Sequence, residues 1–399
     1  MSQFLIIRRV IPWFGAGAIF GYVGNGLVRD FDIRDYSHPD SVDEGTIATP
    51  EESDRTKNHA EDFAPHYPVG FSYPAVSNIV IREAFTTSMN YRTKIPDWVA
   101  EKLTADTING RNGERKHASF KPDTDIREEF RASNADYWDS GWSRGHLAAS
   151  ASHKLSQEGQ NSTFLLNSNI VPQDLSMNGC DWNRLEMLVR DVTKNHPKGT
   201  VYVLSGPVWI PDVSSVTQRL FSKNNTILHE VVGSNNVYVP THMFKIIRLD
   251  NGPDSASAAF IIPNRPILTE EPLESYKVSI ETLEKNTGID MSGFQANTDL
   301  CTITQCEKTT NRRMLGWRHY GFIDLSKNVQ ELQSSVINAV DAGFVDGDNF
   351  LIPKAIRDRM RDLNLGEEPE NLFPDNEKYR TAVSNGFEVF KRKSVVSTE

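Results

Sequence analysis

Residues 141–150 read GWSRGHLAAS and residues 167–190 read NSNIVPQDLSMNGCDWNRLEMLVR, with a short polar connector between them. This stretch contains a histidine beside an arginine, two asparagines nine residues apart, and a glutamate eight residues after the second asparagine. A neutral imidazole accepts a proton near pH 7, amide and carboxylate oxygens suit a hard cation, and arginine binds phosphate oxygens. The pattern therefore predicts metal-assisted hydrolysis of a phosphodiester.

Each of these residues, taken alone, also has a purely structural explanation. Asn178 precedes a helical pattern and is a favourable N-cap, and Glu186 and Arg190 have the i,i+4 spacing of an ordinary ion pair. Asn178 and Glu186 are separated by roughly 12 Å along a helix axis. This distance is too long for both side chains to bind one ion directly. In the functional interpretation, Asn178 binds the metal ion, Glu186 holds a metal-bound water, and Arg190 meets the phosphate.

The stretch as a whole resembles the DNA/RNA non-specific endonuclease family. The family motifs D/S-R-G-H, S-N-x-x-P-Q and N-x-x-x-W-x-R-x-E correspond here to residues 143–146, 168–173 and 178–186. Shorter later segments, at residues 205–207, 239–242 and 262–264, also match. The resemblance covers about residues 70–325.

This resemblance implies a role for each motif residue. His146 would be the general base, Asn178 the Mg²⁺ ligand (with Mn²⁺ as an alternative ion), and Glu186 the carboxylate that acts through water. The residues implied to contact substrate or orient the site are Ser143, Arg144, Asn169 and Arg190. The expected reaction is attack of water on a DNA or RNA phosphodiester, which yields 5′-phosphate and 3′-hydroxyl ends. Family members of this kind form homodimers.

Ser143 departs from the commoner aspartate of the first motif, which is found in endonuclease G. A serine there, with an apolar N-terminal segment and a helical C-terminus, is similar to the EXOG-type mitochondrial 5′-exo/endonucleases. The family fold is an α+β, ββα-metal (His-Me finger) nuclease with a central antiparallel sheet and flanking helices. We expect this nuclease domain at residues 67–325 and a helical C-terminal wing module at residues 326–399.

The periodicity of the chain agrees with a mixed α+β fold. Apolar runs that predict strands lie at residues 78–84, 201–204, 237–249 and 256–262, and residues 96–104 suit either a strand edge or a helix start. Helical periodicity appears at residues 182–194, 271–285, 352–364 and 376–391. Because strands and helices do not alternate strictly, an antiparallel sheet is favoured over a doubly wound one.

Residues 1–28 form a hydrophobic anchor or targeting segment in this interpretation. Residues 10–28 are nineteen positions without a charge, preceded by Arg8 and Arg9, which just suffices to cross a bilayer. A membrane anchor is favoured, and an organellar targeting segment and a secretory signal peptide remain alternatives. With the family resemblance, this predicts a mitochondrial protein at the inner membrane or in the intermembrane space.

Residues 29–66 contain 11 acidic and 4 basic residues and read as a disordered linker. The whole chain has a net charge of −10, so a phosphate-binding surface has to be a local patch. In the C-terminal part, Lys354, Arg357, Arg359 and Arg361 suit either a solvated helix face or an additional DNA grip. Cys301 and Cys306 are able to pair, but two unpaired core thiols are the favoured interpretation.

Two other functions fit parts of the sequence. A secreted or lumenal scavenger endonuclease would share the same motifs, and a catalytically weak relative would serve as a binding or dimer partner. The second alternative is disfavoured because every expected catalytic position is filled.

Overall fold

The computed structural model describes residues 66–68, 78–211, 226–267, 269–308, 310–345 and 351–396, all within one compact unit, residues 58–399. The predicted membrane segment at residues 10–28 and nearly all of the predicted acidic linker lie outside these residues. Among the helices that the structure describes, none is both long and apolar enough to span a bilayer.

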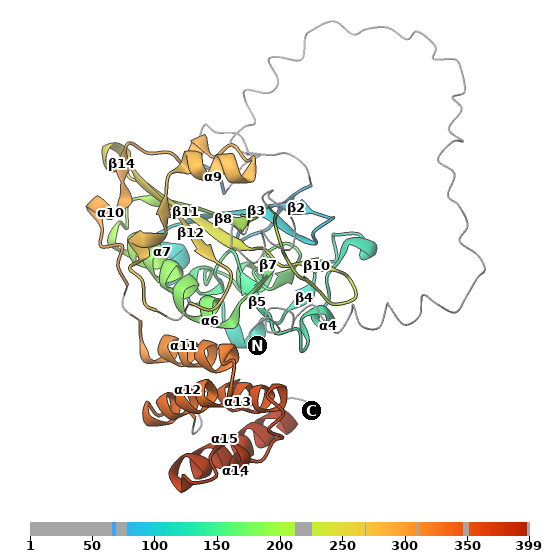
Figure 1. The fold of residues 1–399 in the computed structure, drawn as a ribbon. Helices are drawn as coiled ribbons and strands as arrows, with labels where there is room; N and C mark the ends of the chain where they lie inside the picture. Colours follow the sequence, from blue (N-terminus) through green and yellow to red (C-terminus); the bar gives the residue numbers. More distant parts are fainter. Residues whose placement is uncertain are drawn as a thin grey trace, which may run out of the picture. The chain divides into compact units, whose positions relative to one another are not determined.

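A mostly antiparallel sheet forms the centre of the fold, which confirms the predicted α+β class (Figure 1). Its main path runs in the order β1-β2-β3-β8-β11-β12-β13. The strands are β1 (Ile79–Ile81), β2 (Thr86–Asn90), β3 (Ile95–Leu103), β8 (Thr200–Val208), β11 (His242–Asp250), β12 (Ala256–Pro263) and β13 (Lys277–Val278). Strand β14 (Thr298–Asp299) adds to β12 in parallel, while the pairs along the path are antiparallel.

Both faces of this sheet are buried. In β8, Val201 and Val203 point into one core, with α7 (Asn183–Asn195), and Tyr202 and Leu204 point into another, with α9 (Ile280–Thr287). Side chains alternate between faces along a strand, so a sheet covered on both sides needs apolar residues at successive positions. This explains the continuous apolar runs in the sequence.

The segments that contain the sequence motifs form a second, smaller unit with its own sheet. Four short strands pair in the order β4-β6-β7-β5, namely β4 (Lys121–Pro122), β6 (Leu165–Leu166), β7 (Ile170–Gln173) and β5 (Ser143–His146). After β7 the chain continues through α6 (Leu175–Met177) and a π-helical turn (Asn178–Trp182) into α7. Strands β5 and β7 with this helix form a ββα unit.

The C-terminal part is helical and has its own core. Its helices are α11 (Arg312–Leu325), α12 (Val329–Asp341), α13 (Leu351–Asp362), α14 (Pro369–Leu372) and α15 (Glu377–Val396). Ile323, Leu332, Val336 and Ile356 are among the side chains that share this core. Helix α11 contacts α12 and α13 on one side and α6 and the π-helical turn on the other. It therefore joins the helical part to the ββα unit.

Shorter elements connect these parts. They are α3 (Ala105–Asn109), α4 (Asn134–Tyr137), α5 (Gln157–Ser162), α10 (Leu300–Ile303) and the two-stranded pair β9 (Val231–Val232) and β10 (Val237–Tyr238). Short 3₁₀ turns include η2 (Arg115–His117) and η4 (Ser150–Ser152).

Several predicted elements differ from the structure. The strand predicted at residues 201–204 is longer, because β8 continues to Val208. The strand predicted at residues 237–249 is divided into β10 and β11, with Pro240 between them; proline lacks the N–H that a sheet ladder needs. Only the second half of the helix predicted at residues 271–285 is present, as α9, because Ser279 caps it with its side chain on Thr282 N. Pro96 lies inside β3, opposite a register shift in β2, where the lost donor is tolerated.

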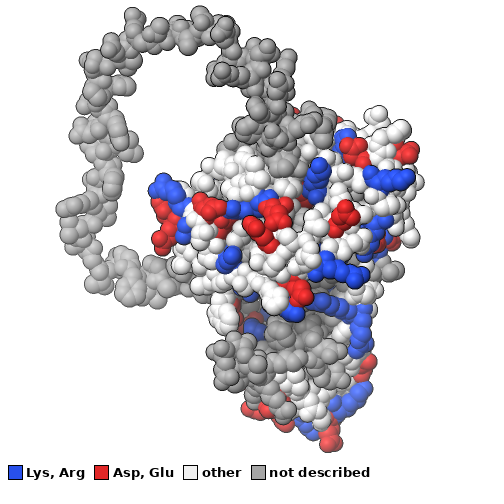
Figure 2. Space-filling view, turned by 180° about the vertical axis from the view of Figure 1, so that it is seen from behind, with Lys and Arg blue, Asp and Glu red and all other residues white. Residues whose placement is uncertain are grey.

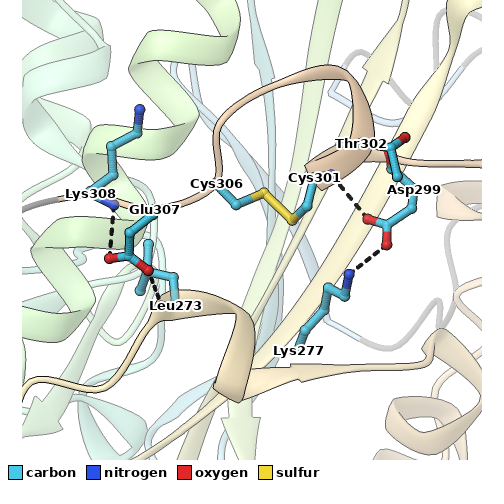
Figure 3. Close-up of a disulfide and its surroundings, with 8 residues drawn as sticks. All are labelled: Leu273, Lys277, Asp299, Cys301, Thr302, Cys306, Glu307 and Lys308. Atoms are coloured by element: carbon cyan, nitrogen blue, oxygen red, sulfur yellow. Dashed lines mark hydrogen bonds and ion pairs between the residues drawn. A yellow bond between two sulfur atoms is a disulfide. The ribbon is translucent and has the colours of Figure 1, made fainter.

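Cys301 and Cys306 form a disulfide, so the interpretation as unpaired thiols was wrong (Figure 3). Their Cα atoms lie 5.1 Å apart because helix α10 turns the chain back between them. The helix is capped by Asp299, which accepts from Cys301 N at 3.0 Å and pairs with Lys277 at 2.5 Å. Cys180 is a buried free thiol.

Removing this disulfide is expected to destabilise the fold modestly. A cross-link that closes so short a loop restrains the unfolded chain by about 2 kcal/mol. We expect the Cys301→Ala/Cys306→Ala protein to lose stability by that order in urea unfolding. A reducing agent should destabilise the wild type and leave the double variant unchanged. Equal unfolding midpoints for wild type and variant under oxidising conditions would contradict the expectation.

Candidate active site

Strand β5 carries the first motif and is aligned by its pairing with β7. Ser143 lies opposite Gln173, and His146 lies opposite Ile170. A Cβ atom on Gly145 would lie 2.1 Å from Gln173 Oε1. A side chain at residue 145 would therefore collide with the buried Gln173 side chain, and His146 lies at the end of the paired segment.

The His146 ring lies among aromatic side chains. Its centroid is 5.4 Å from the ring of Phe120 and 4.8 Å from that of Phe164. Trp182 Nε1 donates to the backbone oxygen of His146 at 3.0 Å, which joins the strand to the start of α7. The ring is half-buried, and its Nε2 atom is covered without a hydrogen bond to any described residue.

This environment keeps the imidazole neutral. Burial lowers the pKa of His146 to about 3, with the nearby cations of Arg115 and Arg144 as further causes. A buried site and like charges both disfavour the protonated form. At neutral pH the ring is thus a proton acceptor, as the general-base prediction requires.

Two arginines flank His146. Arg144 Nη1 donates to Asn134 Oδ1 at 2.6 Å, and its guanidinium lies 4.4 Å from the centroid of the Phe120 ring. Arg115 was not predicted; it is exposed on η2, with its guanidinium 5.3 Å from the Phe164 centroid. It was missed because it lies 29 positions before Arg144 in a polar loop, and the only local signal was the basic run at residues 115–117.

Asn178 begins the π-helical turn and is held by the first motif. Its Nδ2 donates to Ser143 Oγ at 3.0 Å, and Ser143 Oγ donates to the backbone oxygen of Gln173 at 2.7 Å. No described residue donates a hydrogen bond to Asn178 Oδ1. The hydrogen bond of the amide nitrogen therefore orients the side chain, and the amide oxygen is left available to bind a cation.

Glu186 and Arg190 lie side by side on α7. Glu186 Oε2 is 3.8 Å from Arg190 Nη1, and both side chains are 17% exposed. Burial raises the pKa of Glu186, while the cations of Arg190 and Lys245 act in the opposite direction. Arg190 Nη1 is covered and has no hydrogen-bond partner among the described residues. The pair is loose enough to admit water or a phosphate oxygen.

Asn169 lies in a different environment from the other predicted residues. It is 0% exposed, and its Oδ1 accepts from Ala148 N at 2.7 Å. Its Nδ2 donates to the backbone oxygens of Ala148 and Thr163. Both the oxygen and the nitrogen of its side-chain amide form hydrogen bonds with the protein backbone. Asn169 therefore orients the backbone that follows His146.

The available donors suit a hard cation held mainly by water. The described residues contain no group of three or more His, Cys, Asp or Glu that could bind a metal. Asn178 Oδ1 and the Glu186 carboxylate are oxygen donors on the same helical segment. Mg²⁺ keeps several waters and binds through few protein oxygens, so this sparse set fits Mg²⁺ better than zinc.

Three of the basic residues of α13 form ion pairs with acidic side chains. Lys354 lies 2.6 Å from Asp358 and 3.5 Å from Asp139, and Arg359 lies 3.1 Å from Asp362. Arg361 pairs with Asp358. This pairing favours the solvated-face interpretation over an additional DNA grip. Figure 2 likewise shows Lys and Arg interspersed with Asp and Glu on the face that it presents.

The sequence and the fold match known nucleases. A family model described as DNA/RNA non-specific endonuclease matches residues 63–297. The mitochondrial nuclease EXOG of Mus musculus is 30% identical over 380 residues, covering 91% of this chain and 95% of the relative. The mitochondrial endonuclease G of Homo sapiens is 34% identical over 220 residues, covering 55% and 71%.

A solved structure shows the same fold. One chain of a crystal structure of an EndoG/EndoGI complex is 29% identical, with a TM-score of 0.53, and the match covers 60% of this chain and 94% of that chain. The EXOG match leaves 9% of this chain uncovered. It therefore extends into the C-terminal helices.

The electrostatic effect of Arg115 on His146 leads to a pH prediction. Removing a cation that disfavours imidazolium raises the pKa of His146, so in Arg115→Met the acid limb of kcat/KM should move to higher pH. The profile is measured with a DNA substrate from about pH 2.5 to pH 7, a range that includes the pKa of about 3 of His146 in the wild type. Lys116→Met is the matched control, because Lys116 pairs with Glu114 at 2.5 Å. Equal shifts in both variants would contradict the assignment.

Proposed function

Because this chain belongs to the DNA/RNA non-specific endonuclease family and is EXOG-like, we propose that it is a Mg²⁺-dependent mitochondrial nuclease with 5′-exo- and endonuclease activity. As a member of this family it is an enzyme that hydrolyses nucleic acid. The proposal specifies its metal, its products and its compartment. The products are 5′-phosphate and 3′-hydroxyl ends of DNA, with RNA as a second substrate.

The observation that carries the proposal is the link between Asn178 and β5. The Ser143 hydroxyl accepts a hydrogen bond from the nitrogen of the Asn178 amide, so the amide oxygen is left available for a cation. Ser143 belongs to the same strand as His146. Arg115 acts electrostatically on both His146 and Glu186. A base, a cation ligand and phosphate-binding arginines therefore belong to one site.

His146 accepts the proton of the attacking water in this mechanism. We assign the acceptor to Nδ1, because Nε2 is covered by neighbouring residues. Trp182 holds the backbone of His146, and the rings of Phe120 and Phe164 restrict its orientation. A base held in one rotamer loses little entropy on reaching the reactive geometry.

Asn178 and Glu186 would hold the metal ion, Asn178 directly and Glu186 through water. A bound Mg²⁺, for which Mn²⁺ is a plausible substitute, would stabilise negative charge on the leaving 3′ oxygen. Arg144 and Arg190 bind phosphate oxygens, and Arg115 adds a third cation that the sequence patterns did not include. Fork-shaped guanidinium groups suit this task.

Ser143 and Asn169 have positioning roles in this proposal. Ser143 uses its hydroxyl to orient Asn178, and Asn169 uses its whole amide to hold the backbone after His146. Neither residue offers a substrate contact as its main interaction. This differs from the substrate-binding role that was expected for both Ser143 and Asn169.

The cellular and quaternary parts of the proposal rest on the relatives and the sequence. EXOG and endonuclease G are both named as mitochondrial proteins. Attachment to the inner membrane, or location in the intermembrane space, depends on residues 10–28, and the homodimer depends on the family resemblance. The C-terminal helices, which the EXOG match reaches, would favour trimming at 5′ ends.

Product sizing separates the two cutting modes. A duplex with a free 5′ end and one with a blocked 5′ end are digested with Mg²⁺, and the fragments are sized over time. A 5′-exonuclease releases short products from the free end only, whereas an endonuclease cuts both. Absence of products from either substrate would contradict the nuclease proposal and favour a binding or dimer partner.

His146→Ala is expected to reduce kcat by roughly 10²–10⁴-fold, the usual contribution of a general base. The measurement is nucleotide release from internally labelled DNA at saturating Mg²⁺. His196→Ala serves as the control, since His196 lies at the opposite end of α7. A loss of less than threefold in His146→Ala would remove this residue as the base.

Asn178→Ala should abolish metal-dependent turnover, because Asn178 Oδ1 is the only direct ligand in the proposal. Mg²⁺ titration of the rate tests this, with Asn183→Ala as an asparagine control at the start of α7. An unchanged Mg²⁺ titration in Asn178→Ala would exclude it as the ligand.

A further inference from the structure

Helix α11 packs directly against the turn that begins with Asn178. A Cβ atom on Gly179 would lie 2.2 Å from Trp317 Cδ1, and one on Gly321 would lie 2.8 Å from Ser176 Oγ. Both glycines are thus required by contacts between α11 and the segment on either side of Asn178. The tryptophan ring occupies the space that a side chain at residue 179 would need.

Beside the contact between Trp317 and Gly179, Arg318 of α11 interacts with the next two residues of the turn. Arg318 Nη2 donates to Cys180 Sγ at 3.1 Å and lies 3.6 Å from Asp181 Oδ1. Asp181 is 0% exposed, and Arg184 also pairs with it, at 3.0 Å. A buried carboxylate needs cationic partners to remain in the interior. Helix α11 supplies one of the two cations that hold this turn.

The turn depends on such contacts because of its geometry. Residues 178–182 are π-helical, with a wider repeat than the regular helix that follows. Such single turns are uncommon and frequently occur at functional sites. Here the turn is held from one side by Ser143 of β5, through the Asn178 amide, and from the other side by Trp317 and Arg318 of α11.

We propose that α11, the first of the C-terminal helices, positions the metal ligand Asn178, with Trp317 and Arg318 as the positioning residues. The inference rests on the proposed function in one respect, that Asn178 binds the cation. It gives the C-terminal helices a role in metal affinity that is separate from any contact with DNA. Neither residue touches the substrate or the cation in this proposal.

Trp317→Ala and Arg318→Met test the proposal in the full-length chain. Residues that orient a metal ligand typically contribute about 10- to 100-fold in metal affinity. We expect both variants to need about tenfold more Mg²⁺ for half-maximal rate, while kcat at saturating Mg²⁺ stays close to wild type. Direct Mn²⁺ binding, followed by electron paramagnetic resonance without DNA, should weaken by the same factor.

Arg312→Met is the matched control on the same helix. Arg312 Nη2 donates to Gly343 O at 3.0 Å, and its guanidinium lies 4.8 Å from the Phe344 ring centroid, within the helical part. This variant should keep wild-type Mn²⁺ affinity. An equal loss in Arg312→Met would show general destabilisation of the helices and overturn the proposal. So would unchanged Mn²⁺ affinity in Trp317→Ala and Arg318→Met proteins that unfold cooperatively.

Gly179→Ala changes the other partner of the contact between Gly179 and Trp317. It replaces Trp317→Ala as the test if that variant fails to fold. Its added methyl group must displace either the turn or the indole ring, so Mn²⁺ affinity should again fall; retention of wild-type affinity would overturn the proposal.

Asn178→Ala distinguishes a failure of the metal-ligand assignment from a failure of the role proposed for α11. If it retains metal-dependent activity, the ligand assignment fails; if it abolishes that activity while the α11 variants bind Mn²⁺ normally, only the role of α11 fails.

Discussion

The hydrogen bond from Asn178 Nδ2 to Ser143 Oγ is the interaction on which the candidate site depends. It connects the π-helical turn to β5, and β5 is aligned in turn by its pairing with β7 through Gly145. An amide has one donor side and one acceptor side. Fixing the nitrogen therefore determines where the oxygen points, and a single contact sets the direction of the proposed metal ligand Asn178 relative to the proposed general base His146.

The electrostatics of the site depend on burial more than on the net charge of the chain. The protein carries −10 overall, yet Arg115 and Arg144 act on His146 from close range. Short-range interactions in a partly buried site are screened far less than those between exposed charges. An acidic protein can thus present a cationic phosphate site, while elsewhere its basic residues are neutralised by pairing, as on α13.

The sequence predicted the ββα unit well because its residues are close together along the chain and have a fixed spacing. Strand β12 and helix α7, whose periodicity is strong, were also predicted to within about two residues at each end, whereas β8 ends four residues beyond its predicted end, at Val208. Contacts between distant segments were not predictable in this way. Arg115 reaches the site from a polar loop, and Trp317 reaches Gly179 across 138 positions. The Cys301–Cys306 disulfide depends on the short helix α10, and a helix of four residues is too short to produce a recognisable periodicity in the sequence.

Ser143 is where the structure adds most to the motif. Its hydroxyl accepts from Asn178 Nδ2 and donates to the backbone oxygen of Gln173, so it fills two roles at once. An aspartate in the same position could accept from the amide, but its ionised carboxylate has no proton to donate, and it would face the Gln173 oxygen with a negative charge. In this backbone geometry, serine satisfies both neighbours and aspartate satisfies one. The departure from the commoner motif is therefore matched to the local hydrogen bonding, and it leaves the Asn178 amide beside a hydroxyl group instead of a carboxylate at residue 143.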